Sequence, residues 1–264
     1  MTRLAVDIGG THTRVASRRF ATEPDYAAQL AAVVRAIRST GVTPSALGVS
    51  FAGRLDPTGR SVAVSLNLPD YAGRPLRDDL AAALSCPVRV AHDATCGLLG
   101  EYANGGLRGE DRCGYVTLST GVGAALRLGR GAHFVAMTTE AGHQLVAGND
   151  RPCACGQRGC LETLTGGRAL ERHTGRPLST IDDDRFWQDY ADALAAGLAN
   201  FALVAGVEVI ALGGAIILRR PELWCRLTRP TYVPLRLVPA ELGEDAPLVG
   251  AEVLLDTDET AILH

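Results

Sequence analysis

The alternation of apolar and polar positions divides the chain into short strands and longer helices. Apolar runs of three to six residues recur, and several end at glycine or aspartate, which is typical of buried strands followed by tight turns. Longer segments repeat apolar residues at helical spacing and end at glycine. The pattern predicts strands at 4–6, 13–16, 47–52, 88–91, 115–118, 124–128 and 207–212, and helices at 25–38, 76–84, 93–102, 164–173, 184–205 and 247–255.

The order of these segments indicates an α/β protein. A strand, a glycine-rich turn and a return strand open the chain, and the same plan recurs after residue 115. We therefore expect two related α/β domains with a cleft between them, over residues 1–110 and 111–246. The C-terminal segment 247–264 is expected to join the first domain.

Composition narrows the functional class. The chain has 264 residues, of which 47% are hydrophobic, and a formal net charge of −3. We expect no nucleic-acid partner because there is no basic excess. The first residues lack the apolar core of a signal peptide, and no apolar run reaches the length of a membrane span. We therefore expect a cytoplasmic protein with no membrane partner.

The two glycine-rich turns are candidate phosphate-binding loops. The first contains Asp7, Gly9, Gly10 and Thr11, and the second contains Thr120 and Gly121. Glycines let backbone N–H groups approach a phosphate closely, and an aspartate can hold Mg²⁺ directly or through water. Neither turn has the Gly-Lys-Ser/Thr ending of a Walker A loop. The pair Gly213-Gly214, after an apolar strand, is a third candidate point of close approach, suited to adenosine.

Asp93 directly follows the strand 88–91 and begins the next helix. Its position favours two interpretations, an N-cap that satisfies the first helical N–H groups or a general base that accepts a proton from a substrate hydroxyl.

A histidine and three cysteines form the candidate metal site. His143 precedes Cys153, Cys155 and Cys160 within 18 residues. A Cys₃His set is typical of structural zinc, so we expect a zinc knuckle over 143–160. A redox pair would normally read Cys-x-x-Cys, and a nucleic-acid ribbon would carry basic and aromatic flanks.

Together these segments resemble the ROK family of sugar kinases and repressors. The resemblance is carried along the chain by DIGGTHTRVA at 7–16, HDATCGLLGEY at 92–102, STGVG at 119–123, EAGH at 140–143, CACGQRGCLE at 153–162 and ALGGAI at 211–216. It implies an actin-like, ribonuclease H-like two-domain ATPase fold with an interdomain cleft. It also implies ATP, Mg²⁺ and structural Zn²⁺ as cofactors, and a homodimer or a dimer of dimers.

The resemblance also implies roles for single residues. Asp93 would be the catalytic base, with the glycine-rich turns at the phosphates and metal and Gly213 and Gly214 at the adenosine. The sugar-side positions would be Gly53, Arg54, Asn67, His92, Asp93, Glu140, His143 and Glu162. We therefore expect phosphorylation of a hexose at its primary hydroxyl, the 6-position.

Three departures leave the substrate open. Family kinases usually have asparagine where this chain has His92, the family's GxxGxAGE run is replaced at 131–140, and the segments 17–25 and 165–200 are short. Glucose is the default substrate. An amino or N-acetylated sugar (GlcNAc, ManNAc or kanosamine-like) is an alternative, since Arg54 and His92 could contact a 2- or 3-substituent, and a cyclitol is another.

A non-catalytic, sugar-sensing regulator is the alternative from a different class. The repressors of the family carry a helix-turn-helix segment before the first hairpin, which begins here at Leu4. With Asp93 and both glycine-rich turns present as well, we expect a kinase.

Overall fold

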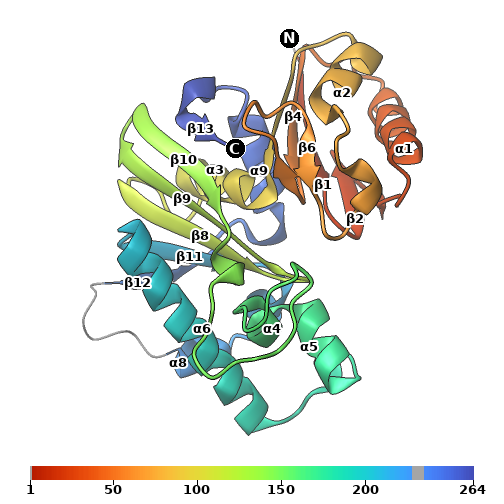
Figure 1. Cartoon of the computed structure of the whole chain (residues 1–264). Coiled ribbons are helices and arrows are strands. Elements are labelled where there is room, and N and C mark those ends of the chain that lie inside the picture. The colour runs from red at the N-terminus through yellow and green to blue at the C-terminus, as the bar shows by residue number, and fades with distance from the viewer. Residues whose placement is uncertain (1, 228–234) are drawn as a thin grey trace. The chain divides into compact units, whose positions relative to one another are not determined.

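The computed structural model describes residues 2–227 and 235–264. The chain forms two compact units (Figure 1). Unit 1 comprises Met1–Asn104, Val135–Met137 and Asp245–His264, and unit 2 comprises Gly105–Phe134 and Thr138–Glu244. None of the helices in the described ranges combines the length and apolarity that a membrane crossing requires.

Unit 1 contains a five-stranded sheet of order β3-β2-β1-β4-β7. The first three strands form antiparallel pairs, and β4 and β7 run parallel to β1. Because parallel strands end at the same edge of a sheet, β1, β4 and β7 bring Ile8, Phe51 and His92 into one row. The strands are β1 (Arg3–Ile8), β2 (His12–Val15), β3 (Arg18–Ala21), β4 (Ala46–Phe51) and β7 (Val88–His92).

Helices cover both faces of this sheet, with α1 and α2 on one side and α3 and α9 on the other (Figure 1). Helix α1 begins after Asp25, whose carboxylate accepts a hydrogen bond from the Ala28 N–H and caps the first turn. The helices are α1 (Tyr26–Arg38), α2 (Leu76–Leu84), α3 (Asp93–Asn104) and α9 (Ala246–Val253), and shorter elements are β5 (Arg54–Leu55), β6 (Val62–Val64), η1 (Pro69–Tyr71), η5 (Glu259–Ala261) and β13 (Ile262–Leu263).

Unit 2 is built on a sheet of order β12-β11-β8-β9-β10. Its strands are β8 (Arg112–Leu118), β9 (Val122–Arg130), β10 (His133–Thr139), β11 (Val209–Gly213) and β12 (Arg236–Pro239). Within β10, Ala136 and Met137 belong to unit 1, where they pair with β13. Strand β8 pairs antiparallel with β9 and parallel with β11, so the β8–β9 hairpin repeats the plan of the β1–β2 hairpin.

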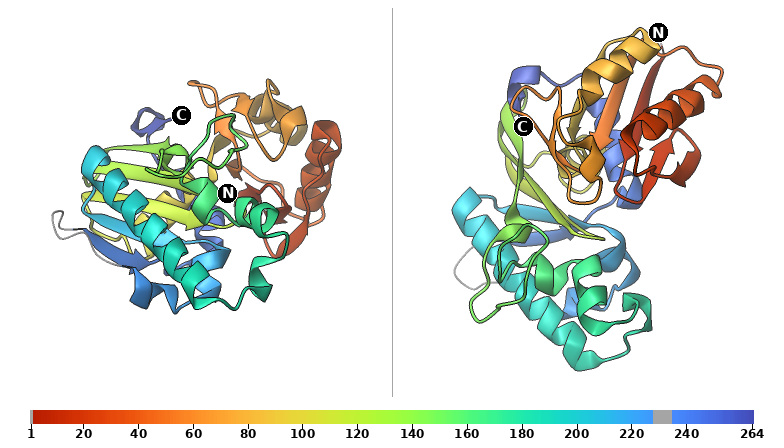
Figure 2. Two further views of the ribbon diagram at one scale, coloured as in Figure 1. Left: turned by 60° about the horizontal axis from the view of Figure 1, so that its bottom comes forward. Right: turned by 45° about the vertical axis from the view of Figure 1, so that its right-hand side comes forward.

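Helix α6 (Asp184–Ala205) is the longest element of unit 2 and runs across one face of its sheet (Figure 2). Asp183 accepts hydrogen bonds from the N–H groups of Arg185 and Phe186 and caps its start, and Gly206 ends it in the left-handed conformation, with φ 66°. The ring of Phe201 packs over Gly114 of β8, where a side chain would clash. The other helices are η2 (Ala141–His143), α4 (Glu162–Thr165), α5 (Gly167–Thr174), η3 (Leu178–Thr180), α7 (Ala215–Arg219), α8 (Leu223–Arg226) and η4 (Gly243–Asp245).

The predicted helices 76–84 and 184–205 have the same bounds in the structure. The predicted helix 164–173 is wrong as a single element. The chain forms α4 and α5 instead, because Gly166 is extended (φ −86°, ψ 132°) and Gly167 donates its N–H to the Ser119 carbonyl. The predicted strand at 207–212 corresponds to β11, which begins two residues later and ends with Gly213.

Candidate functional site

The first glycine-rich turn connects β1 to β2. Gly9 donates its N–H to the carbonyl of His12, and a Cβ at Gly9 would lie 2.8 Å from that oxygen. Only glycine fits this turn without displacing the backbone. A Cβ at Gly10 would lie 3.0 Å from the Cβ of Asn67, so Asn67 packs directly against the turn. Thr11 is exposed.

Asp7 lies buried at the start of this turn and is fully engaged by neighbours in unit 1. Its Oδ2 accepts hydrogen bonds from Nε and Nη2 of Arg14 at 3.1 and 2.9 Å, and its Oδ1 accepts one from the Ser50 hydroxyl at 2.7 Å. Arg14 also donates through Nη1 to Asp245 at 2.9 Å. Asp7 and Arg14 are direct cross-strand partners in the hairpin, so the register itself creates the ion pair.

Burial raises the pKa of the Asp7 carboxyl above its ordinary value of 3.8. The Arg14 charge and the hydrogen bonds from Ser50 and Arg14 act in the opposite direction, and the nearby negative charge of Asp93 acts with burial. This interaction indicates that Asp7 and Asp93 lie in one electrostatic environment, at the common edge formed by β1 and β7.

Asp93 is the first residue of α3 and directly follows β7. Its Oδ1 lies 3.0 Å from Nδ1 of His92, and the same nitrogen lies 3.1 Å from the backbone N–H of Ala94. Neutral Nδ1 accepts the Ala94 hydrogen bond, whereas protonated Nδ1 donates to the carboxylate. Whether Nδ1 of His92 carries a proton therefore decides whether the imidazole donates a hydrogen bond to the Asp93 carboxylate.

Two further expected sugar-side residues, Gly53 and Arg54, follow β4. A Cβ at Gly53 would lie 2.5 Å from the Phe51 ring and 2.9 Å from the Cβ of Ser65, so close packing requires glycine there. Arg54 lies in β5 opposite Val64, and its side chain is exposed.

The second glycine-rich turn, in unit 2, is held by the first two residues of α5. Ser119 and Thr120 accept hydrogen bonds through their carbonyls from the N–H groups of Gly167 and Arg168. Glu162, the first residue of α4, accepts a hydrogen bond from the Val122 N–H at 2.9 Å. A Cβ at Gly121 would lie 2.6 Å from the same carboxylate oxygen.

Gly213 and Gly214 pack against strand β8. A Cβ at Gly213 would lie 2.7 Å from the Tyr115 hydroxyl, and one at Gly214 would lie 2.5 Å from the Leu118 backbone. Gly214 also has a φ of +88°, which only glycine adopts readily. Contacts within the protein therefore account for both glycines.

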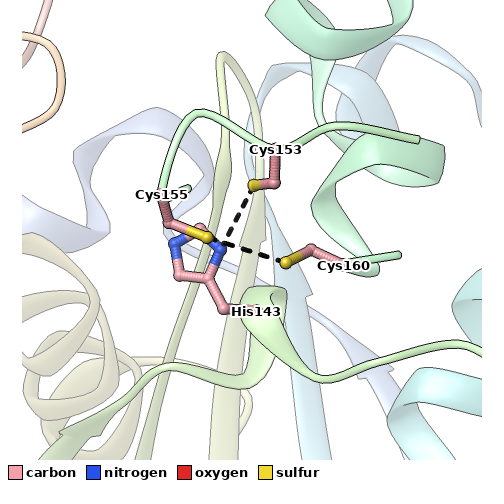
Figure 3. A group of neighbouring side chains, drawn as sticks. All are labelled: His143, Cys153, Cys155 and Cys160. Atoms are coloured by element: carbon pink, nitrogen blue, oxygen red, sulfur yellow. Dashed lines mark hydrogen bonds between the residues drawn. The ribbon is translucent and has the colours of Figure 1, made fainter. Parts of the chain in front are cut away.

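His143, Cys153, Cys155 and Cys160 converge in unit 2, with their side chains directed toward one another (Figure 3). Their potential ligand atoms all lie within 4.8 Å of one another. The Cys153 N–H donates to the Gln157 carbonyl, which closes a turn around the second cysteine, Cys155. Gly159 has a φ of +85°, and a Cβ there would lie 2.6 Å from the Asn149 carbonyl oxygen.

The spacing of these atoms fits a tetrahedral zinc ion. Zinc bonds to sulfur and nitrogen place two sulfurs about 3.8 Å apart, and a sulfur and a nitrogen about 3.6 Å apart. Sγ of Cys155 lies 3.7 Å from Sγ of Cys160, and Sγ of Cys153 lies 3.6 Å from Nδ1 of His143. Nε2 of His143 lies 3.9 Å from the Glu140 carboxylate, which is itself largely exposed.

Electrostatics within the cluster also favour a cation. Burial raises the pKa of the Cys153 thiol, and burial with hydrogen bonds from the other cysteines raises that of Cys160 to about 12. Burial acts in the same direction at Cys155 but is outweighed by hydrogen bonds, led by the Gln157 N–H, so its pKa is lowered. Three adjacent thiolates are unfavourable without a positive charge between them, and a metal ion supplies it.

Each unit thus brings together some of the site residues that the sequence predicted. Unit 1 brings together the Asp7 turn, Asn67, His92 and Asp93, and unit 2 brings together the second turn, Glu162, Glu140 and the Cys₃His cluster. Sequence reasoning missed Arg14 and Ser50 as partners of Asp7. The signal for Arg14 lies in the hairpin register, which pairs residues 7 and 14 once the turn length is known.

Comparisons with known proteins identify the family and the fold of the chain. The ROK family model matches residues 3–258. A glucokinase from Thermotoga maritima is 29% identical over 260 residues, covering 82% of this chain and 81% of that protein. An N-acetylmannosamine kinase from Haemophilus influenzae is 27% identical over 225 residues, covering 74% of each. The structure of a ROK family glucokinase from Streptomyces griseus, in complex with glucose and AMPPNP, is 26% identical with a TM-score of 0.78, covering 94% of this chain and 97% of that one. The likeness confirms the expected actin-like α/β fold.

Proposed function

Because the chain belongs to the ROK family, we propose that it is a sugar kinase that transfers the γ-phosphoryl group of ATP to a hexose, with Asp93 as the general base. The curated relatives support the reaction class, since they are a glucokinase and an N-acetylmannosamine kinase. The position of Asp93 at the end of β7, beside His92 and in the electrostatic environment of Asp7, is the observation that carries the residue assignment.

In this reaction the Asp93 carboxylate accepts the proton of a sugar hydroxyl as its oxygen forms a bond to the γ-phosphorus. The bond between that phosphorus and the β,γ-bridging oxygen breaks, and ADP leaves with the electron pair. Phosphoryl transfer depends mainly on positioning and charge stabilisation. Backbone N–H groups of the two glycine-rich turns, at Gly10 and Gly121, would supply hydrogen bonds to the phosphates.

Magnesium would accompany the nucleotide in this proposal. Asp7 is a poor direct ligand, because Arg14 neutralises its Oδ2 and Ser50 occupies its Oδ1. We assign Asp7 to holding the turn in place, with any contact to the cation passing through water.

Zinc is the metal that best fits His143, Cys153, Cys155 and Cys160. A closed set of four protein ligands leaves no position for a substrate, so its role would be structural. The ion would fix η2, which directly follows Glu140, relative to α4, which begins at Glu162. We assign both glutamates, with Gly53, Arg54 and Asn67, to the sugar side of the reaction.

The acceptor hydroxyl is proposed to be the 6-hydroxyl of a glucose-like sugar. His92 gives a specific reason to consider an amino or N-acetylated sugar as well. When Nδ1 accepts the Ala94 hydrogen bond, the ring proton lies on Nε2, which is then a donor toward a sugar substituent.

The test is ADP release measured across glucose, N-acetylmannosamine, N-acetylglucosamine, 3-amino sugars and cyclitols. We expect stimulation by at least one hexose and a loss of roughly 10²–10⁴-fold in kcat for Asp93→Asn. Asp78→Asn, which alters an exposed carboxylate paired with Arg60, is the matched control and should retain activity. Absence of sugar-stimulated ADP release in the wild type would contradict the kinase assignment, and an active Asp93→Asn would contradict the base.

A further inference from the structure

Unit 1 has a pocket of about 590 Å³ between its edge strand β3 and helix α1. This volume is within the range of small-molecule sites. All nine lining residues belong to unit 1, and none is among the residues assigned to phosphoryl transfer. They are Arg18, Arg19, Phe20, Ala21, Glu23, Ala32, Arg35, Ala36 and Ser39.

The β3 side of the pocket is set by strand register. Arg18 and Phe20 lie opposite Val15 and Thr13 of β2, so the side chains of these four residues share one face of the sheet. Helix α1 covers that face, where its Gln29 donates a hydrogen bond to the Thr13 hydroxyl. Arg18 and Phe20 are therefore directed toward α1.

The α1 side follows from helical spacing. Ala32, Arg35, Ala36 and Ser39 are separated by three, one and three residues, so they share one face of the helix. Alanines at two of these positions leave space where larger side chains would close the gap. The pocket thus has an apolar base, formed by Phe20 with the two alanines, and guanidinium groups around it.

The charge of the pocket is opposite to that of the chain. Three arginines and one glutamate line it, although the net charge of the protein is −3. In the part of the chain that the structure describes, neither Arg18 nor Arg35 has a carboxylate within ion-pair distance. Exposed arginines elsewhere, such as Arg60 and Arg130, lie against aspartates.

Protection of the sheet edge explains only part of this pattern. Charged side chains on an edge strand discourage pairing with other chains, which accounts for arginines in β3. It does not account for Arg35, which lies on the helix, or for the alanines and Phe20 that form a pocket beneath the charges.

We propose that this pocket is a second ligand site, which binds the phosphate group of a small phosphorylated metabolite between Arg18 and Arg35. A phosphate monoester carries close to two negative charges at neutral pH, and guanidinium groups bind phosphate oxygens in a forked geometry. The space beyond the phosphate accommodates a sugar or base ring against Phe20. The site is separate from the proposed kinase reaction and does not depend on it.

The experiment is calorimetric titration of the full chain with inorganic phosphate, glucose 6-phosphate and AMP. Glucose 6-phosphate and AMP distinguish a sugar phosphate from a nucleotide as the bound class. We expect one of the two to bind more tightly than inorganic phosphate, and the double variant R18A/R35A to weaken that binding roughly a hundredfold, about tenfold for each charge-assisted contact removed.

Arg172→Ala is the matched control, because it removes an exposed arginine on α5 and should leave binding unchanged. Without added ligand, the kinase rate of R18A/R35A should equal that of the wild type. Hydrogen exchange of the wild type gives a second readout, which is independent of variant folding, and ligand should slow exchange at residues 32–39. Equal binding by wild type and double variant, or no change in exchange at 32–39, would overturn the proposal.

Discussion

The Glu162 carboxylate accepts a hydrogen bond from the backbone N–H of Val122, at 2.9 Å. Glu162 follows Cys160 by two residues, and Val122 follows the second glycine-rich turn. The contact therefore connects the Cys₃His knuckle to a candidate phosphate-binding loop within one unit. This contact supports the proposal that the knuckle positions the loop.

Replacing Glu162 should separate this positioning role from sugar binding. Glu162→Ala removes the acceptor for Val122, and we expect kcat/KM for ATP to fall by roughly tenfold to a hundredfold, since hydrogen bonds to charged groups are worth about 1.5–3 kcal/mol. Glu162→Gln keeps an acceptor oxygen for the Val122 N–H, so this variant should retain most of the wild-type kcat/KM for ATP. Steady-state kinetics with each substrate varied in turn provide the measurement. Equal losses for both variants, confined to the sugar KM, would refute the loop contact.

Metal removal should affect unit 2 selectively. Purified protein is expected to contain one zinc per chain, and Cys160→Ser should lose it, because Cys160 is buried within the cluster. Zinc must displace the thiol protons, including that of Cys160, whose pKa is about 12, so affinity should rise with pH. Metal analysis and competition with a chelator at several pH values measure both effects. Cys225→Ser, at an exposed cysteine outside the cluster, is the control and should retain full zinc content.

Features that depend on local chemistry could be read from the sequence. Apolar spacing predicts α6, and four ligands within 18 residues predict the Cys₃His cluster. Other features depend on strand register and tertiary packing, which the sequence alone does not show. Asp7 meets Arg14 only because the hairpin pairs them, and the pocket beside Phe20 exists only because β3 forms the sheet edge next to α1.

Asp7 allows a test of whether burial or ion pairing dominates its titration. Burial raises the folded-state pKa above 3.8, so between the unfolded and folded pKa values the folded state holds more protons. The contribution of Asp7 to the free energy of unfolding should therefore fall as pH rises through this window. Relative to wild type, Asp7→Asn should gain stability as the pH rises above about 4, measured by urea unfolding. The opposite trend would show that pairing with Arg14 outweighs burial.

Helix α9 packs so closely in unit 1 that its glycine has no tolerable replacement. A Cβ at Gly250 would lie 1.6 Å from the Cys96 carbonyl oxygen of α3, and one at Gly48 of β4 would lie 1.7 Å from the Ala251 carbonyl oxygen. Both obstacles are backbone atoms, which cannot move aside as a side chain can. Gly250→Ala should therefore lower the free energy of unfolding by about 3 kcal/mol or more, despite the higher helix propensity of alanine.

The control for Gly250→Ala is Glu252→Ala, an exposed position on the same helix, which should change stability by less than about 0.5 kcal/mol. Urea unfolding followed by far-UV circular dichroism gives both values. Because α9 packs against β1 and β4, which carry Asp7 and Ser50, Gly250→Ala should also lower kcat at temperatures where the protein remains folded. A Gly250→Ala protein with unchanged stability would mean that α9 does not pack on α3 at this distance.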